Sequence, residues 1–270
     1  AQVKKSQIQQ RDNKWKRKAM HGHFRVYLEK AHVDSMMSFS WMKRHPVTPS
    51  LEASIFAIQD QAVKTKYHRK NICSESLEDT LCRLCKRCDE TIHHIVSACE
   101  RLANTSYIWR HNSLVKYIYW ILAKDNHFEV PGQWWNWRLN EHRVMENSTS
   151  KILWEVPVQT DVEVSNNKPD IIYIDCSTNK TYLIDTTVPS DYNIGAKEFD
   201  KLVRYQDLRK EIKRLWKTDA EVIPIVIGAT GVVAKSIKRY TEKLSPNIDI
   251  SILQKQEAIC TASNVSRVLA

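Results

Sequence analysis

Two aspartates lie at the ends of two short apolar runs that a polar turn joins. Residues 170–176 (DIIYIDC) and 181–187 (TYLIDTT) are typical of strands, and the Ser-Thr-Asn-Lys segment between them suits the turn of an antiparallel hairpin. In that pairing Asp170 and Asp185 lie opposite or nearly opposite each other at the open end, with Cα atoms ~4.5–5.5 Å apart. Asp175 is an odd number of residues from Asp170, so we expect it on the other face, outside any site.

Two facing carboxylates repel each other, and without a compensating charge the pKa of one of them would rise. A divalent cation can compensate, and Mg²⁺ prefers carboxylate and phosphate oxygens. The predicted helix after the hairpin carries Lys197, Lys201 and Arg204 at spacings of four and three, hence on one face. Two acids beside a cation are the groups that phosphodiester hydrolysis uses. The alternatives are a surface hairpin with solvated acids and a helix with a solvated basic face.

A cysteine and histidine cluster precedes this region in the segment CRLCKRCDETIHHIVSAC. Cys82, Cys85, His94 and Cys99 follow the spacing C-x2-C-x8-H-x4-C, which predicts a structural tetrahedral zinc site. The set Cys85, Cys88, His94 and Cys99 ranks second, and His93 is a further spare candidate. The alternative to a metal site is a group of small buried thiols with a core histidine. Cys73, Cys176 and Cys260 are expected to be ordinary thiols.

Composition and charge limit the class of protein. The chain has 270 residues, 42% of them hydrophobic, with seven cysteines and a net charge of +10. Residues 1–150 hold 24 basic and 15 acidic residues, whereas residues 151–270 hold 17 and 16. A basic front half, in a chain with nine tryptophans, suggests a polyanionic partner such as nucleic acid. A merely soluble basic surface is the alternative, and charge alone does not decide between the two. Clustered cysteines favour a reducing compartment, and no apolar run reaches the ~18–20 residues that span a bilayer. The chain begins with Ala and a charged segment without a visible signal peptide, as a piece of a longer protein would.

The pattern along the chain predicts an α/β protein. Residues 1–33 read as a basic helix or a solvated arm, and residues 34–70 as helical, with Thr48 capping and Pro49 opening a helix. Helical periodicity also marks residues 100–125, 196–217, 234–244 and 253–268, and Pro131 and Gly132 mark a boundary. Strand-like segments follow at residues 151–164, 170–176, 181–188 and 221–231.

The order of these motifs resembles one known family. KPD at residues 168–170, DTTVP at 185–189 and KLVRYQDL at 201–208, preceded by the cysteine and histidine segment, resemble the C-terminal part of site-specific non-LTR retrotransposon polyproteins. Segments AIQDQAVKTKYHRKNI, RHNSLVKYIYW, KILWEVPVQTD and EVIPIVIGATGVV are also similar, so the resemblance runs from about residue 18 to the end. It implies a CCHC zinc knuckle followed by a restriction-like endonuclease of the PD-(D/E)xK type, a mixed sheet flanked by helices.

The resemblance also assigns residues and regions. It implies a basic helical linker at 1–72, a knuckle with helices at 73–130 and the endonuclease at 140–270. Asp170 and Asp185 match the magnesium-binding acids and Lys168 the basic residue before PD. Lys201 matches a catalytic lysine that has moved from the strand, where Thr187 now stands, to the next helix. Arg204 replaces a second lysine, and Glu146 or Asp161 is expected to supply a further acid.

The family's activity implies target DNA and element RNA as partners and a nuclear location, with structural Zn²⁺ and catalytic Mg²⁺ but no small-molecule cofactor and no membrane. Such an enzyme nicks target DNA, and the nick primes reverse transcription of the element's RNA. The sequence holds no Tyr-x-Asp-Asp motif and no Asp-Asp pair, so we expect no polymerase active site in this fragment. The alternative is a catalytically inactive zinc-knuckle module that only binds nucleic acid.

Overall fold

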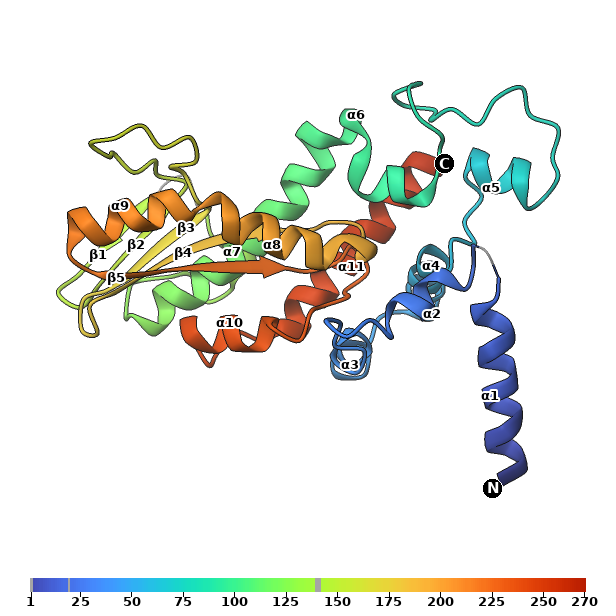
Figure 1. The fold of residues 1–270 in the computed structure, drawn as a ribbon, viewed down its shortest axis with the longest axis horizontal. Coiled ribbons are helices and arrows are strands. Elements are labelled where there is room, and N and C mark those ends of the chain that lie inside the picture. The colour runs from blue at the N-terminus through green and yellow to red at the C-terminus, as the bar shows by residue number, and fades with distance from the viewer. Residues whose placement is uncertain (1, 19, 139–141) are drawn as a thin grey trace.

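A single mixed β-sheet organises the C-terminal half of the part of the chain that is described. The computed structural model describes residues 2–18, 20–138 and 142–270. Its strands lie in the order β1-β2-β3-β4-β5 (Figure 1), with antiparallel pairing from β1 to β4 and parallel pairing of β4 with β5. The strands are β1 (Val144–Glu146), β2 (Ser150–Trp154), β3 (Ile171–Asp175), β4 (Lys180–Thr187) and β5 (Asp219–Val226). The chain is therefore of mixed α/β class, as predicted.

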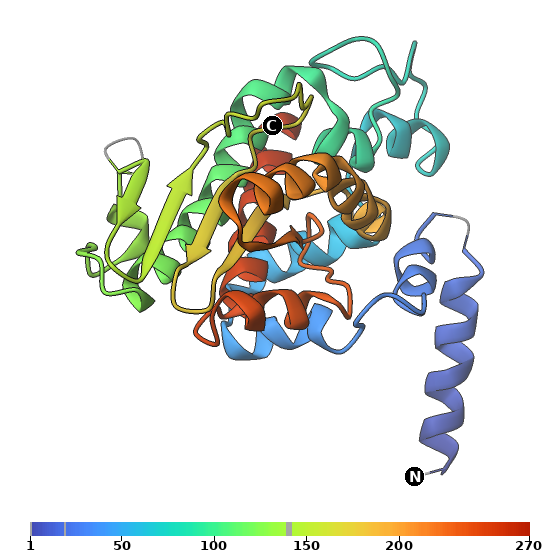
Figure 2. The same cartoon turned by 60° about the vertical axis from the view of Figure 1, so that its left-hand side comes forward.

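Helices cover both faces of this sheet. On one face lie α8 (Ile194–Arg204) and α9 (Gln206–Trp216), which meet at Tyr205. Tyr205, together with Leu208 and Ile212 of α9, packs against Ile172 and Leu183 of the sheet. On the other face lie α7 (Ile108–Asp125), α10 (Ile237–Leu244) and α11 (Ile250–Leu269). Figures 1 and 2 show these two layers with the sheet between them. The alternation of apolar residues along β3 and β4 sends neighbouring side chains into the two cores.

The N-terminal half is helical. It contains α1 (Gln2–Lys16), α2 (His23–Tyr27), α3 (Met37–Arg44), α4 (Pro49–Gln59), α5 (Lys66–Asn71) and α6 (Glu100–Leu102). The described residues also form two π-helical turns, His94–Ala98 and Ala103–Tyr107, and two 3-10 turns, Trp134–Asn136 and Asp191–Asn193. Helix α1 forms the basic helix, rather than a solvated arm, and projects away from the rest of the protein (Figures 1 and 2).

Several local predictions are confirmed and others are corrected. Thr48 caps α4 by accepting a hydrogen bond from the Leu51 amide, and Pro49 is the first helical residue. The segment predicted as one helix at 196–217 is two helices that meet at Tyr205. The strand predicted at 151–164 ends at Trp154, because Glu155 adopts a left-handed φ of 48° and turns the chain out of the sheet. The short β1 strand was not predicted.

In the described part of the chain, the regions predicted at 1–72, 73–130 and 140–270 pack against one another. Helix α7, within residues 73–130, contributes its apolar side to the same core as β2, β3 and β4. Helix α11 contacts α3 and α4 as well as α7. The predicted start of the last region, residue 140, lies outside the described residues. Among the described helices, none has the length and apolar character that crossing a membrane requires.

One buried arginine connects these parts. Arg110 of α7 is 2% exposed and donates hydrogen bonds to Thr261 Oγ1 (2.9 Å), to Val96 O (2.9 Å) and to Val188 O (3.0 Å). Its Nε lies 3.8 Å from Oε2 of the fully buried Glu257. The guanidinium thus holds together the cysteine-rich segment, the end of β4 and α11.

We predict that Arg110→Met lowers the free energy of unfolding by about 3–5 kcal/mol, because it leaves the Thr261 hydroxyl and two buried carbonyls without their donor and removes the cation beside the buried Glu257. The exposed Arg101, on α6, is a matched control, and Arg101→Met should change stability by less than about 0.5 kcal/mol. Chemical denaturation measures both. A loss below about 1 kcal/mol for Arg110→Met would contradict this role.

Candidate active site and metal centre

The β3–β4 hairpin brings Asp170 and Asp185 to the same edge of the sheet. Its last paired residues are Ile171 and Ile184, so Asp170, one residue before β3, lies opposite Asp185. This is the register that the sequence predicts. Asp185 continues into the parallel pairing with β5, opposite Pro224. Both carboxylates therefore lie where the antiparallel hairpin opens.

Asp185 is surrounded by groups from the kink between α8 and α9. The Lys201 ammonium forms an ion pair with Asp185 Oδ2, and their side chains are 13% and 4% exposed. The Tyr205 hydroxyl donates a hydrogen bond to Asp185 Oδ1 at 3.1 Å. Burial raises the pKa of Asp185, and the nearby Asp170 acts in the same direction, while Lys201 and Tyr205 oppose them. Lys201 lies on the predicted helix, and its side chain extends to Asp185.

Asp170 is held by a helix on the opposite side of the sheet. His111 Nε2 of α7 lies 3.0 Å from Asp170 Oδ2, and the Thr186 amide and hydroxyl donate to the same oxygen at 2.6 and 2.8 Å. Burial acts to raise the pKa of Asp170, but these hydrogen bonds and the histidine charge bring it below its usual value. Burial lowers the pKa of His111, but the bond to Asp170 and its charge outweigh burial and raise it to about 9. His111 is therefore a second cation at this site.

Sequence reasoning did not single out His111, Thr186 or Tyr205 as site residues. Tyr205 had a usable signal, because it is four residues after Lys201 and so lies on the same side of the helix. Thr186 follows Asp185 directly, but whether its amide faces Asp170 depends on the register of the two strands. His111 lies 59 residues before Asp170, so only the packing of α7 against the strand ends reveals it.

The other predicted basic residues lie at the rim. Lys168 is exposed, with its Nζ 3.3 Å from Glu155 Oε2, and its carbonyl lies 3.3 Å from the Tyr205 hydroxyl. Arg204 is exposed on α8. Lys197, one turn before Lys201, is also exposed and pairs with Asp200 at 3.1 Å. Of the three predicted cations on α8, Lys201 is the one that forms an ion pair with the acids.

Neither acid proposed as a further metal ligand lies near this pair. Glu146 pairs with Lys151 on the β1 edge, and Lys151 faces Ile174 at the turn end of the hairpin. Asp161 pairs with Arg214 of α9 at 2.7 Å. Glu155 is closer in the fold, because its amide donates to the carbonyl of Asp170 at 2.8 Å.

The predicted zinc ligands converge on one point. Cys82, Cys85, His94 and Cys99 place their ligand atoms within 4.8 Å of one another, with Cys85 Sγ 3.2 Å from His94 Nε2 and Cys82 Sγ 3.9 Å from Cys99 Sγ. Such a set could hold a metal ion such as zinc in tetrahedral coordination. Among the described residues it is the one group of three or more cysteine, histidine or acidic side chains this close together.

A tight turn and a wide helical turn position these ligands. Between Cys82 and Cys88 the chain reverses, with Lys86 in a left-handed conformation (φ 59°), and the Cys82 amide donates to the Cys88 carbonyl at 2.8 Å. The Leu84 amide donates to Cys82 Sγ at 3.4 Å. His94 begins a π-helical turn and Cys99 follows it, so their side chains meet the first two.

The spare candidates lie outside the cluster. Cys88 is exposed. The His93 ring points elsewhere, with Nδ1 3.0 Å from Ser190 Oγ. Burial lowers the pKa of His94, which favours the neutral ring that metal binding requires. Burial raises the pKa of Cys99 to about 11, so without a metal this side chain is a neutral thiol. The first of the two predicted ligand sets is therefore the one that the geometry favours.

Comparison with known proteins adds no assignment. No protein-family model matches the chain, and no curated protein matches it significantly.

For the cluster we predict that Cys82→Ser and Cys99→Ser lower the zinc bound per chain from about one to near zero and lower the unfolding temperature, since folded ligand sets draw stability from the metal. Cys88→Ser is the matched control and should keep its zinc. Elemental analysis of purified protein measures this. Loss of zinc in Cys88→Ser, with retention in Cys82→Ser, would favour the second ligand set instead.

For the acid pair we predict a stability change with pH in magnesium-free buffer. The folded pKa of His111 is about 9 and the unfolded value about 6.5, so its stabilisation is complete below pH ~6.5 and is lost as pH rises toward 9. The loss should be about 1–3 kcal/mol in the parent and absent in His111→Gln. Denaturant titrations at several pH values measure it. Parallel curves for the two proteins would contradict the charged state of His111.

Proposed function

We propose that this chain is the endonuclease part of a site-specific non-LTR retrotransposon protein. It hydrolyses a phosphodiester bond of target DNA with Mg²⁺, and the nick primes reverse transcription of the element's RNA. The reacting groups are Asp170, Asp185 and Lys201, with Lys168 and Arg204 binding the phosphate backbone at the rim.

The proposal is carried by the Lys201 ammonium, which meets the Asp185 carboxylate beside Asp170. This pair is largely buried, with the Lys201 and Asp185 side chains 13% and 4% exposed, so the cost of desolvating the two charges offsets much of their attraction and the pair contributes little net stability. In a hydrolytic site, however, an ammonium at this place neutralises charge that develops on a phosphate or holds the attacking water. The mixed sheet with helices on both faces agrees with a restriction-like architecture and supports the same proposal.

The acid pair suits a hard cation. The three hydrogen bonds from His111 and Thr186 go to Asp170 Oδ2, which leaves Oδ1 to bind an ion together with the Asp185 carboxylate. When bound, Mg²⁺ would supply Lewis-acid activation of the phosphate and of water. The protein's own contribution is orientation, since His111 and Thr186 fix one carboxylate and Tyr205 fixes the other.

The remaining features favour a nucleic-acid partner. The basic N-terminal region, with the exposed α1, would hold target DNA or element RNA through phosphate contacts. The cysteine and histidine cluster would hold structural zinc, because four protein ligands leave no open position for catalysis. A nuclear location follows from a chromosomal target.

A second candidate function is supported by one observation. Each acid already has a cation of the protein beside it, His111 for Asp170 and Lys201 for Asp185. The pair is therefore neutralised without a metal, as a degenerate site could be. On this alternative the chain is a zinc-knuckle module that binds nucleic acid and does not cut it.

A nicking assay on supercoiled DNA with Mg²⁺ separates the two functions. We predict that the parent nicks, and that Asp170→Asn and Lys201→Ala each lose about 100-fold or more in rate while DNA binding is retained. Lys197→Ala, one turn away on the same helix, should nick within about twofold of the parent.

The outcomes differ clearly. A parent that binds DNA without nicking, under all divalent ions tried, supports the binding module. Equal nicking by Asp170→Asn and the parent would show that another site does the cutting.

A further inference from the structure

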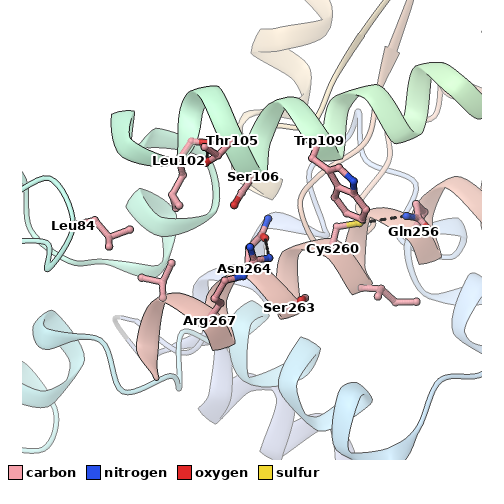
Figure 3. Close-up of a pocket in the computed structure, with 12 residues that line it drawn as sticks. Leu84, Leu102, Thr105, Ser106, Trp109, Gln256, Cys260, Ser263, Asn264 and Arg267 are labelled. Atoms are coloured by element: carbon pink, nitrogen blue, oxygen red, sulfur yellow. Dashed lines mark hydrogen bonds between the residues drawn. The ribbon is translucent and has the colours of Figure 1, made fainter. Parts of the chain in front are cut away.

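A cavity lies on the other side of α7 from the acid pair. It has a volume of about 760 Å³ and is bounded by the turns before α7, by the start of α7 and by the last turns of α11 (Figure 3). Trp109 lines it, whereas His111, two residues later, contacts Asp170. Two residues turn an α-helix by about 200°, so the two side chains leave α7 on nearly opposite sides.

The cavity has a polar floor with an unused donor. Asn264 of α11 is 5% exposed, and its amide Nδ2 has no hydrogen-bond partner, while its Oδ1 accepts from Arg267 at 3.0 Å. Figure 3 shows Asn264 between the two helices, on the side of Ser106. A buried amide without a partner costs free energy. Because Nδ2 is itself covered, a turn of the Asn264 side chain would be needed for it to meet an acceptor atom of a ligand.

The walls favour a flat ligand that is linked to negative charge. Leu84, Leu102 and Val268 provide apolar surface, and the indole of Trp109, 59% exposed, stands at the mouth. None of the described residues that line the cavity is acidic, and Arg267 carries a positive charge. An unpaired nucleobase matches this set: it stacks on an indole, it offers acceptor atoms to an asparagine amide, and its phosphates meet a guanidinium.

The cavity also lies next to the proposed cutting site. A smaller hollow of about 290 Å³ on the other side is lined by Thr187 and His111 together with Tyr107 and Ile108. Exposed Ile108 and Trp109 form the ridge of α7 between the two hollows. A helix is about 10–12 Å across, a distance that a few nucleotides of single strand can span.

We propose that this cavity binds one unpaired base of a single strand of nucleic acid. The strand crosses the Ile108 and Trp109 ridge, with its backbone near the acid pair and the base against Trp109 and Asn264. The base-binding site does not depend on the proposed function. Only the statement that the bound strand is the strand being cut rests on it. The site would hold DNA melted near the nick or an unpaired segment of RNA, and both offer the same chemistry.

The test is binding of fluorescent 10-nucleotide oligonucleotides, measured by anisotropy without added Mg²⁺ and without chelator. Trp109→Ala should weaken binding of single-stranded DNA or RNA about 5- to 100-fold, because one stacked base is lost. Trp109→Phe should restore most of the affinity. Trp135→Ala is the matched control, since Trp135 is 57% exposed but lies outside the cavity, and it should bind within about twofold of the parent.

Two further arms identify the ligand. Asn264→Leu should reduce differences in affinity among the four homopolymers, and duplex DNA should bind equally to Trp109→Ala and the parent. A comparison of oligo-dT with oligo-U tells whether DNA or RNA is the preferred source.

The proposal is overturned if folded Trp109→Ala binds single strands like the parent, or if it loses duplex binding equally. Absence of nicking by the parent, with the Trp109 effect intact, would remove the endonuclease and leave the base site. Normal nicking with no Trp109 effect would remove the base site alone.

Discussion

The site depends on electrostatic compensation of two carboxylates at the open end of one hairpin. The register of β3 and β4 places Asp170 opposite Asp185, and like charges this close are unfavourable unless opposite charges reach them. Two helices on opposite faces of the sheet supply those charges, α7 through His111 and α8 through Lys201. Both helices therefore contact the same pair of acids, and the kink between α8 and α9 directs Tyr205 at Asp185.

The same helix joins this site to the rest of the protein. Within four residues, α7 presents Ile108 and Trp109 at the surface, Arg110 in the buried contact between the cysteine-rich segment and α11, and His111 at the acids. Arg110 joins the two regions directly, because its guanidinium donates to Val96, within the turn that leads to Cys99, and to Val188, after β4.

Local patterns predicted the hairpin and the cluster, because strand alternation and ligand spacing are properties of short segments. Helical period placed three basic residues on one face, and the family resemblance selected Lys201 among them. Two ligand sets remained open until the turn at Lys86 exposed Cys88 and brought Cys82 inward. The roles of His111 and Asn264 were not predictable, because each depends on contacts between segments far apart in sequence. Glu146 and Asp161 were wrong choices for a further acid at the pair, since their positions follow from β1 and α9, which pair them with Lys151 and Arg214.

The central claim is that Asp170 and Asp185 hold a divalent ion beside Lys201. Crystals grown with Mn²⁺ in place of Mg²⁺ test this directly through anomalous scattering. We expect a manganese peak in contact with a carboxylate oxygen of both aspartates, and a zinc peak among Cys82, Cys85, His94 and Cys99 serves as an internal reference. A zinc peak with no manganese between the aspartates, and Lys201 still paired with Asp185, would contradict it.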